Sequence, residues 1–162
     1  MISAIVAVDE NWGIGYQGQL LKHIPADLKH FKELTLNSIV VMGRKTWESL
    51  PKKPLPDRLN VVVSSASRED CFAVSFNFIK QWLLTMKSSD IDVFIIGGGQ
   101  IYNALLPYCD RVYVTKIYAS HDNIDTFFPN LDESREWNAI EEDSMTSYNN
   151  IKYQFWRYDR VS

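Results

Sequence analysis

The sequence predicts a single α/β domain with a mixed, mostly parallel central sheet, four flanking helices and a C-terminal antiparallel hairpin. Up to residue 117, short apolar, β-branched runs alternate with amphipathic stretches. This alternation is typical of a parallel sheet with helices on both faces. The last third instead carries strand-like segments with alternating side chains around a turn-like stretch at 147–150. We expect one domain over residues 1–162.

The predicted strands are the runs richest in valine and isoleucine. They span Ile2–Val8, Ile39–Met42, Leu59–Val63, Phe72–Phe76, Ile91–Ile96 and Arg111–Ile117. The predicted helices lie between them and have apolar residues at three- and four-residue spacing. They span Pro25–Leu34, Arg44–Leu50, Asn77–Lys87 and Gln100–Leu106. The hairpin is expected to join Trp137–Met145 to Asn150–Tyr158.

Composition excludes several classes of protein. The 17 basic and 20 acidic residues give a net charge of −3, which suggests neither a nucleic-acid footprint nor a membrane-binding patch. The apolar start, Met1–Val8, is too short for a spanning helix and has no cleavage-site pattern. Cys71 and Cys109 are far apart, and the three histidines have no metal-ligand spacing. We therefore expect free thiols, no metal site and a cytoplasmic location.

One acidic residue falls on the apolar side of a predicted helix. The apolar stripe there consists of Ile24, Leu28, Phe31 and Leu34, and the solvent face of Lys29, His30, Lys32 and Glu33. Asp27 lies between Phe31 and Leu34 on the helical wheel, so its carboxylate should point at the core. A buried carboxylate is costly unless a cation or hydrogen-bond donor meets it, and a ligand can supply one. The alternative is a first-turn acid that stabilises the helix dipole by ~0.3–1 kcal/mol.

Two predicted strand-to-helix junctions have residues suited to binding anions. In the first, Gly43 ends a strand and is followed by Arg44, Lys45 and Thr46. The helix dipole disfavours cations at this end, so the two basic residues favour the binding of an external anion. The alternative is that both are exposed bases on a solvated surface.

The second junction has three consecutive glycines, Gly97–Gly99, between a strand and a helix. A helix cap needs only one glycine, and the N–H groups of such a turn can line an anion-binding nest. Ser64 and Ser65 follow another strand and would add hydroxyl donors, although a serine-rich loop is usually only a loop.

A third glycine-rich segment, Gly13–Gly18, matches the dinucleotide-binding fingerprint in its letters. That motif should follow its strand directly and open a helix. Here polar residues 9–12 intervene, and the next predicted helix begins at Pro25. We expect a mobile, glycine-hinged loop over Asp9–Gln19 rather than a Rossmann site.

Taken together, these segments resemble the dihydrofolate reductase family over nearly the whole chain. The segments that carry the resemblance are Gly13–Gly15, Ile24–Lys32, Val41–Leu50, Pro54–Arg58, Ile96–Tyr102 and Asp125–Pro129. The resemblance implies an oxidoreductase that uses NADPH to reduce 7,8-dihydrofolate to tetrahydrofolate for one-carbon metabolism. It also implies a monomer that binds dihydrofolate and folate-like inhibitors, and no nucleic-acid or membrane partner.

The resemblance also assigns substrate-binding residues. Asp27 would be the catalytic residue and would pair with the 2-amino and N3 edge of the pterin, while Thr115 would hydrogen-bond Asp27. Arg58 would hold the glutamate carboxylate of the folate tail, although in a proline-rich turn such an arginine is more often merely exposed. The apolar walls would come from Ile5, Ala7, Leu28, Phe31, Leu50 and Ile96.

The implied cofactor site uses both glycine junctions. The backbones of Ala7 and Ile14 would meet the nicotinamide, with Tyr102 near the ring. Cations and hydroxyls would meet the 2′-phosphate and favour NADPH over NADH: Arg44, Lys45, Ser64 and Ser65. The other cofactor contacts would be Gly15, Leu20, Gly43, Thr46, Trp47, Ile96, Gly97, Gly98, Gly99, Gln100, Ile101 and Thr126. The family also implies a cis peptide at Gly97–Gly98.

The chain departs from the family pattern beside the loop expected to act as a lid. Leu21-Lys22 stands where the family usually has Pro-Trp. Lys22 would either supply a cation that competes for Asp27 or extend to solvent. Ile124 stands where the family often has glycine, which puts the contact between Asp125 and the lid in question.

Two other functions are alternatives to the one that the resemblance implies. One is a reductase of the same fold acting on another heterocycle, as in the riboflavin-pathway pyrimidine reductases; the setting of Asp27 and Arg58 argues against it. The other is a pterin- or nucleotide-binding protein without turnover. Asp27, Thr115 and the two glycine junctions argue against that alternative.

Overall fold

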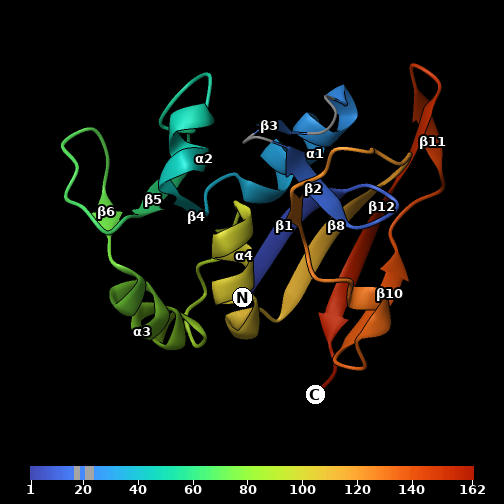
Figure 1. The fold of residues 1–162 in the computed structure, drawn as a ribbon. Coiled ribbons are helices and arrows are strands. Elements are labelled where there is room, and N and C mark those ends of the chain that lie inside the picture. The colour runs from blue at the N-terminus through green and yellow to red at the C-terminus, as the bar shows by residue number, and fades with distance from the viewer. Residues whose placement is uncertain (17–18, 21–23) are drawn as a thin grey trace.

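The computed structural model describes residues 1–16, 19–20 and 24–162. Its central sheet has the order β10-β12-β8-β1-β7-β4-β5-β6, and β11 also pairs with β12 (Figure 1). Neighbouring strands from β8 to β6 run parallel, whereas β10, β11 and β12 pair antiparallel. The strands span Ile2–Val8 (β1), Ile39–Gly43 (β4), Leu59–Val63 (β5), Ala73–Val74 (β6), Val93–Ile95 (β7), Arg111–Tyr118 (β8), Trp137–Glu141 (β10), Thr146–Tyr148 (β11) and Ile151–Arg160 (β12). The predicted fold class is confirmed.

In the described ranges four α-helices flank this sheet, close to the predicted bounds. They span Pro25–Thr35 (α1), Arg44–Ser49 (α2), Phe76–Met86 (α3) and Gly99–Leu105 (α4), with 3-10 turns at Leu106–Tyr108 and Leu131–Glu133. None of the helices in the described ranges is long and apolar enough to cross a membrane.

The predicted strand Phe72–Phe76 is wrong at its C-terminal end. Only Ala73–Val74 is extended, and α3 already begins at Phe76. The reason is a helix cap, because Ser75 Oγ accepts a hydrogen bond from the Phe78 backbone N–H at 3.1 Å. Serine at this position satisfies an N–H group that the helix leaves unpaired, so it favours a helix start over a continued strand.

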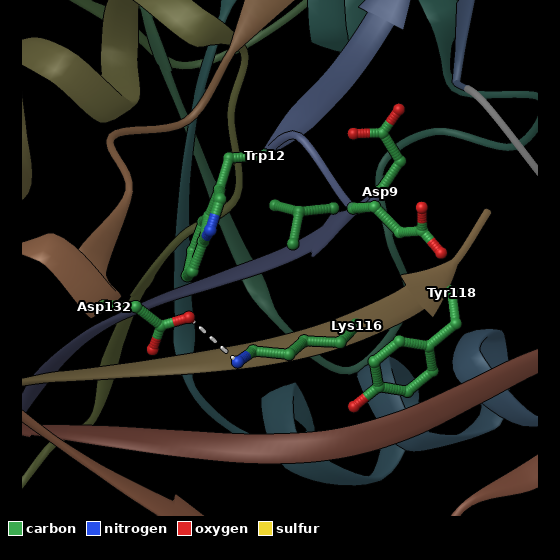
Figure 2. Close-up of a pocket in the computed structure, with 7 residues that line it drawn as sticks. Asp9, Trp12, Lys116, Tyr118 and Asp132 are labelled. Atoms are coloured by element: carbon green, nitrogen blue, oxygen red, sulfur yellow. Dashed lines mark hydrogen bonds and ion pairs between the residues drawn. The ribbon is translucent and has the colours of Figure 1, made fainter. Parts of the chain in front are cut away.

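A second, smaller sheet joins the segment predicted as a mobile loop to a distant part of the chain. Its order is β3-β2-β9, with β2 at Gly13–Tyr16, β3 at Gln19–Leu20 and β9 at Thr126–Phe127. Asp9 and Trp12 lie in the turn between β1 and β2 (Figure 2). Asp9 Oδ1 accepts hydrogen bonds from the backbone N–H groups of Asn11 and Gly13, at 2.9 and 2.8 Å. The prediction of a loop over Asp9–Gln19 is therefore wrong for β2, and the rejection of a Rossmann helix is supported; residues 17–18 lie outside the described part.

The C-terminal hairpin is present, but its first predicted strand ends early, and β11, the strand directly before the turn, lies beyond that prediction. Asn149 and Asn150 have φ of 49° and 63°, which suits the two-residue turn between β11 and β12. Between β10 and β11 the Asp143 carboxylate accepts the Phe155 backbone N–H at 3.1 Å. A side chain thus replaces a backbone acceptor beyond β10, so the predicted strand Trp137–Met145 is wrong after Glu141, and the next strand begins only at Thr146.

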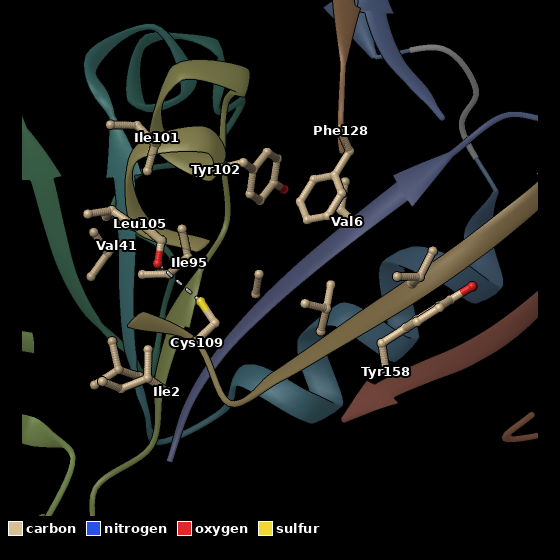
Figure 3. Close-up of a cluster of buried hydrophobic side chains, with 14 of the residues drawn as sticks. Ile2, Val6, Val41, Ile95, Ile101, Tyr102, Leu105, Cys109, Phe128 and Tyr158 are labelled. Carbon is tan, nitrogen blue, oxygen red and sulfur yellow. Dashed lines mark hydrogen bonds between the residues drawn. The ribbon is translucent and has the colours of Figure 1, made fainter. Parts of the chain in front are cut away.

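The sheet buries an apolar layer on each face, because successive strand residues point to opposite sides. One layer packs against α3 and α4 (Figure 3). It includes Ile2, Val41, Ile95, Ile101, Leu105, Cys109 and Tyr158. The other layer packs against α1 and α2 and includes Ile5, Val40, Met42, Trp47, Val62 and Phe94. The candidate site lies on this second face, at the carboxyl ends of the parallel strands.

Candidate active site

Helix α1 holds the carboxylate of Asp27 against the central sheet. Thr115 Oγ1 in β8 donates a hydrogen bond to Asp27 Oδ1 at 2.6 Å. Thr115 is 3% exposed, and its register neighbours are Ala7 in β1 and Phe155 in β12. The structure thus has the inward carboxylate and the Thr115 hydrogen bond that the sequence predicted.

The surroundings of Asp27 do not fully compensate its negative charge. Burial raises the pKa of Asp27 above its ordinary value, and the Thr115 hydrogen bond and the charge of His30 only partly oppose this rise. No lysine or arginine of the described ranges forms an ion pair with this carboxylate. Lys22, the proposed competing cation, lies outside the described residues. The site therefore favours a ligand that brings N–H donors or positive charge.

His30 was predicted on the solvent face of this helix, and that prediction is wrong. The ring is half-buried and stacks on Phe155, with ring centroids 4.0 Å apart and planes at 16°. Burial lowers the pKa of His30, although carboxylates on α1 and on the segment after β10 oppose this effect. Those carboxylates belong to Asp27, Asp143, Glu33 and Glu142. The reason for the error is tertiary: strand β12 passes beside α1 and covers a position that helical periodicity assigns to solvent.

Four of the predicted wall residues belong to one apolar cluster. Ile5, Phe31, Leu50 and Ile96 pack together with Met42, Trp47, Phe94 and Tyr113, among others. Ala7 packs in the adjoining cluster with Ile24, Ile117 and Phe155. Tyr113 was missed, although its position two residues before Thr115 on the same strand places both on one face.

Leu28 does not pack against the core as predicted, because it is 55% exposed. The covered side of α1 runs through Asp27, Phe31 and Leu34, which leaves Leu28 at its margin. Helical periodicity correctly identified the buried side of α1, but it wrongly included Leu28.

Arg58 is half-buried rather than merely exposed. Its Nε donates to the Pro56 carbonyl at 2.9 Å, and an Nη atom donates to Thr35 Oγ1 at 3.1 Å. The guanidinium lies 5.9 Å from the centroid of the Phe31 ring. Arg58 therefore stands two helical turns beyond Asp27, with Phe31 between them.

The two glycine junctions lie side by side. Strands β4 and β7 are neighbours, and the Gly43 N–H donates to the Gly97 carbonyl at 2.8 Å. Gly97 has φ of 116°, and the Gly97–Gly98 peptide is cis, as the family resemblance implied. A Cβ at Gly43 would lie 2.9 Å from Ile101 Cγ1, and one at Gly99 would lie 2.5 Å from Thr126 Cγ2. Side chains are therefore excluded at both positions by close packing.

Other residues assigned to the cofactor converge on the same corner. A Cβ at Gly98 would meet Thr46 Oγ1 at 3.6 Å, so α2 and the second junction face one another. Ile14 is 8% exposed, and its Cδ1 would lie 4.0 Å from a Cβ at Gly99. Ser64 is half-buried and Ser65 exposed after β5, the strand next to β4, while Lys45 and Gln100 are exposed.

Tyr102 connects α4 to the strand that carries the apolar wall. Its hydroxyl donates to the Ile5 carbonyl at 2.6 Å, and its ring lies against Gly97. Burial raises the pKa of Tyr102, so the phenol stays protonated and keeps this hydrogen bond.

Two segments depart from the family pattern: Ile124, which lies within the described residues, and Leu21-Lys22, which does not. The Asp125 backbone N–H donates to the Gly15 carbonyl at 3.2 Å, so this segment does contact β2 despite isoleucine at position 124. Leu20 pairs with Gly15 through the backbone, and its side chain is outside the described part, as are Leu21 and Lys22.

Arg44 already has an anionic partner within its own helix, and its expected contact with an external anion stays a prediction. Its guanidinium pairs with Glu48 at 2.9 Å, one helical turn on. Glu48 also pairs with Arg68 at 3.2 Å, and Arg68 pairs with Asp70 at 2.9 Å. The sequence reasoning missed Glu48, Arg68 and Asp70, although the four-residue spacing of Arg44 and Glu48 was a usable signal.

A hollow on the opposite face of β8 is a different feature. It is lined by Val8, Asp9, Glu10, Trp12, Lys116, Tyr118 and Asp132 (Figure 2). Lys116 pairs with Asp132 at 3.1 Å and lies 4.2 Å from the centroid of the Trp156 ring. Because Lys116 pairs with Asp132, and Asp9 is met by backbone N–H groups and His121, this hollow is a weaker candidate than the Asp27 side. Within the described ranges, no cluster of three or more His, Cys, Asp or Glu side chains is placed to hold a metal ion.

Comparison with known proteins identifies the family to which this chain is similar. The family model described as dihydrofolate reductase matches residues 1–160. Dihydrofolate reductase of Bacillus subtilis (strain 168) is 38% identical over 162 residues, which cover 99% of this chain and 95% of the relative. Dihydrofolate reductase of Neisseria meningitidis serogroup B is 35% identical over 159 residues, with 98% of both chains covered.

A bifunctional relative shows the same match within a longer protein. The bifunctional dihydrofolate reductase-thymidylate synthase of Daucus carota is 38% identical over 179 residues. The match covers 97% of this chain but 33% of that relative. The similarity thus concerns one part of the bifunctional protein.

Proposed function

Because this chain belongs to the dihydrofolate reductase family, we propose that it reduces 7,8-dihydrofolate to 5,6,7,8-tetrahydrofolate with NADPH. A hydride is added at C6 of the pterin and a proton at N5. The observation that carries the proposal is the half-buried carboxylate of Asp27, which has a hydrogen bond from Thr115 and no ion pair with a lysine or arginine in the described ranges. Such a group is stabilised by a flat ligand that offers adjacent N–H donors.

Asp27 has the capacity to bind such a ligand. An ionised carboxylate has about four lone-pair sites, and Thr115 occupies one of them. The remaining sites would accept the 2-amino group and N3 of the pterin. The Thr115 hydrogen bond would fix the orientation of the carboxylate while the substrate binds.

The apolar cluster would hold the ring and keep water from the reacting atoms. Ile5, Phe31, Leu50 and Ile96 belong to the cluster that packs α1 and α2 against the sheet. A buried negative charge at Asp27 would favour the protonated form of the pterin, since opposite charges interact strongly where water is scarce. Arg58 stands beyond Phe31, where it would meet a carboxylate at the far end of an extended substrate.

The residues at the glycine junctions are chemically suited to NADPH. Bound NADPH would supply the hydride. At Gly98 a Cβ would meet only Thr46 Oγ1 among the described residues, at 3.6 Å, so the open backbone there would offer room for the pyrophosphate. Arg44, Lys45 and the serine hydroxyls after β5 offer cations and donors for a phosphate ester at the adenosine end. This donor set supports a preference for NADPH over NADH.

The proposal includes a monomeric cytoplasmic enzyme that folate-like inhibitors block by competing for Asp27. A net charge of −3 supports a small-molecule partner rather than nucleic acid. Sedimentation of the purified chain would test the monomer.

The testing experiment mixes the protein with NADPH and 7,8-dihydrofolate and follows NADPH absorbance across pH. We expect oxidation that depends on both compounds. Turnover of a ribosylaminopyrimidine but not of dihydrofolate would replace the proposal with the pyrimidine reductase reaction. Tight binding of dihydrofolate without NADPH oxidation would indicate a binding protein instead.

A further inference from the structure

Glu48 is shared by two arginines at the edge of the proposed cofactor site. Its Oε1 lies 2.9 Å from Arg44, and its Oε2 lies 3.2 Å from Arg68. Arg44 comes from the same helix as Glu48, whereas Arg68 comes from the loop after β5. One carboxylate thus connects the two segments that carry the proposed 2′-phosphate contacts.

The two arginines differ in how firmly they are held. The side chain of Arg44 is 48% exposed and has Glu48 as its carboxylate partner among the described residues. The side chain of Arg68 is 20% exposed and makes a second, two-point pair with Asp70, at 2.9 and 3.0 Å. Trp47 Nε1 fixes Asp70 with a hydrogen bond of 3.0 Å. Arg44 is therefore the arginine that can turn away from Glu48.

The strength of the Arg68–Asp70 pair agrees with this view. The hydrogen bond with Asp70 raises the pKa of Arg68, and the hydrogen bond from Arg68 lowers the pKa of Asp70. Both groups are stabilised in their charged forms, so Arg68 remains a fixed cation beside Glu48.

We infer that Glu48 competes with the 2′-phosphate of the cofactor for Arg44, and that Arg68 eases this competition by keeping Glu48 paired when Arg44 turns to the phosphate. Without Arg68, a bound phosphate would leave Glu48 as an unpaired negative charge beside a dianion, and this repulsion would oppose binding. Arg68 is thus a specificity-determining residue that acts through Glu48. The inference rests on the NADPH preference proposed above.

The test measures the affinity of the full chain for adenosine 2′,5′-bisphosphate and for adenosine 5′-monophosphate by calorimetry. The ratio of the two affinities isolates the contribution of the 2′-phosphate. We expect Glu48→Gln to raise this ratio and Arg68→Gln to lower it, each by about twofold to fivefold, the scale of exposed ion pairs. Glu69→Gln makes the same charge change as Glu48→Gln in the loop beside Arg68 and should leave the ratio nearly unchanged.

The double variant distinguishes this account from a general effect of charge. If Arg68 acts through Glu48, Arg68→Gln should have no further effect once Glu48 is glutamine. An equal loss in both backgrounds would mean that Arg68 acts on the phosphate directly, and it would overturn the inference. A lower ratio in Glu48→Gln would also overturn it, because Glu48 would then orient Arg44 for binding.

Two further measurements separate the role of Arg68 from local unfolding and from the proposed reaction. Arg68→Lys keeps the cation and should retain most of the wild-type ratio, which separates loss of charge from local unfolding around Asp70 and Trp47. A wild-type ratio of one would contradict the inference even if the enzyme reduces dihydrofolate. Conversely, a high ratio without turnover would reject the proposed reaction and leave the role of Glu48 standing.

Discussion

The substrate side and the cofactor side of the candidate site treat charge in opposite ways. On the substrate side, Asp27 is a single carboxylate, buried against the sheet and fixed by the Thr115 hydroxyl. On the cofactor side, cations and carboxylates alternate on the surface, with side chains 20% to 52% exposed. The charge of Asp27 is therefore only partly compensated by its neighbours, whereas the charged side chains on the cofactor side form ion pairs with one another.

Because of this difference, we expect pH and salt to affect ligand binding differently on the two sides. A buried charge is poorly screened, so substrate binding should depend strongly on pH and weakly on salt. Exposed charges are screened by counterions, so discrimination at the 2′-phosphate should weaken as salt is added. The predictions below test that contrast.

The largest effect is expected from Asp27→Asn. Removing the negative charge should lower kcat/KM for dihydrofolate at pH 7 by about 100-fold or more, the scale of losing a preorganised electrostatic group. Activity should recover in part at acidic pH, where the substrate is already protonated. Steady-state kinetics across pH would check this, and a wild-type rate and profile would remove Asp27 from its proposed role.

Thr115→Val should have a smaller effect on the same side. The variant removes the donor to Asp27, and we expect about a tenfold loss in kcat/KM, as for one hydrogen bond to a charged group. Because that hydrogen bond lowers the pKa of Asp27, the acidic limb of the pH profile should also move to higher pH. Thr115→Ser keeps the hydroxyl and serves as the control. Equal losses in both variants would point to packing rather than hydrogen bonding.

Arg44→Ala tests the cofactor side. We expect NADPH binding to weaken by about fivefold to tenfold at low salt, the range of an exposed charge-assisted contact, while NADH binding is unchanged. The loss should shrink at high salt, in contrast to the Asp27 variant. Equal weakening of both cofactors would mean that Arg44 does not meet the 2′-phosphate.

A change in stability should accompany the pH behaviour of the substrate side. Since burial raises the pKa of Asp27, the carboxyl favours the folded state when protonated. Its contribution is fully present below the unfolded value of about 3.9 and is lost as the pH rises through the folded value. Asp27→Asn should therefore raise the free energy of unfolding at pH 7 by ~1 kcal/mol and have little effect below about pH 4. Denaturant titration at both pH values measures this, and a destabilised variant at pH 7 would contradict it.

Much of the fold could be predicted because it depends on local signals. Strands β1 and β5 have their predicted bounds, since continuous β-branched runs mark strands buried on both faces. Helix α1 begins at Pro25 as expected for proline in the first turn. Pairing between β2 and β9 could not be predicted, because it joins Gly13–Tyr16 to Thr126–Phe127 without a distinctive pattern in either.

In the candidate site, too, residues with a local signal could be predicted, and residues that depend on tertiary contacts could not. Asp27 was identifiable because a charge on an apolar stripe is a local inconsistency that a single helix reveals. The burial of His30 required knowledge of β12, and the exposure of Leu28 depended on how α1 is tilted against the sheet. The pairing of Arg44 with Glu48 follows a local four-residue spacing, whereas the second partner of Glu48, Arg68, comes from a loop that no short pattern indicates.

The most direct test is the titration of the Asp27 carboxyl by carbon-13 NMR, with and without bound dihydrofolate. We expect the pKa of Asp27 to lie above its ordinary value in the free protein and to be lower in the complex, because the ligand brings positive charge and N–H donors to the carboxylate. An Asp27 pKa that stays the same or rises on binding would contradict it.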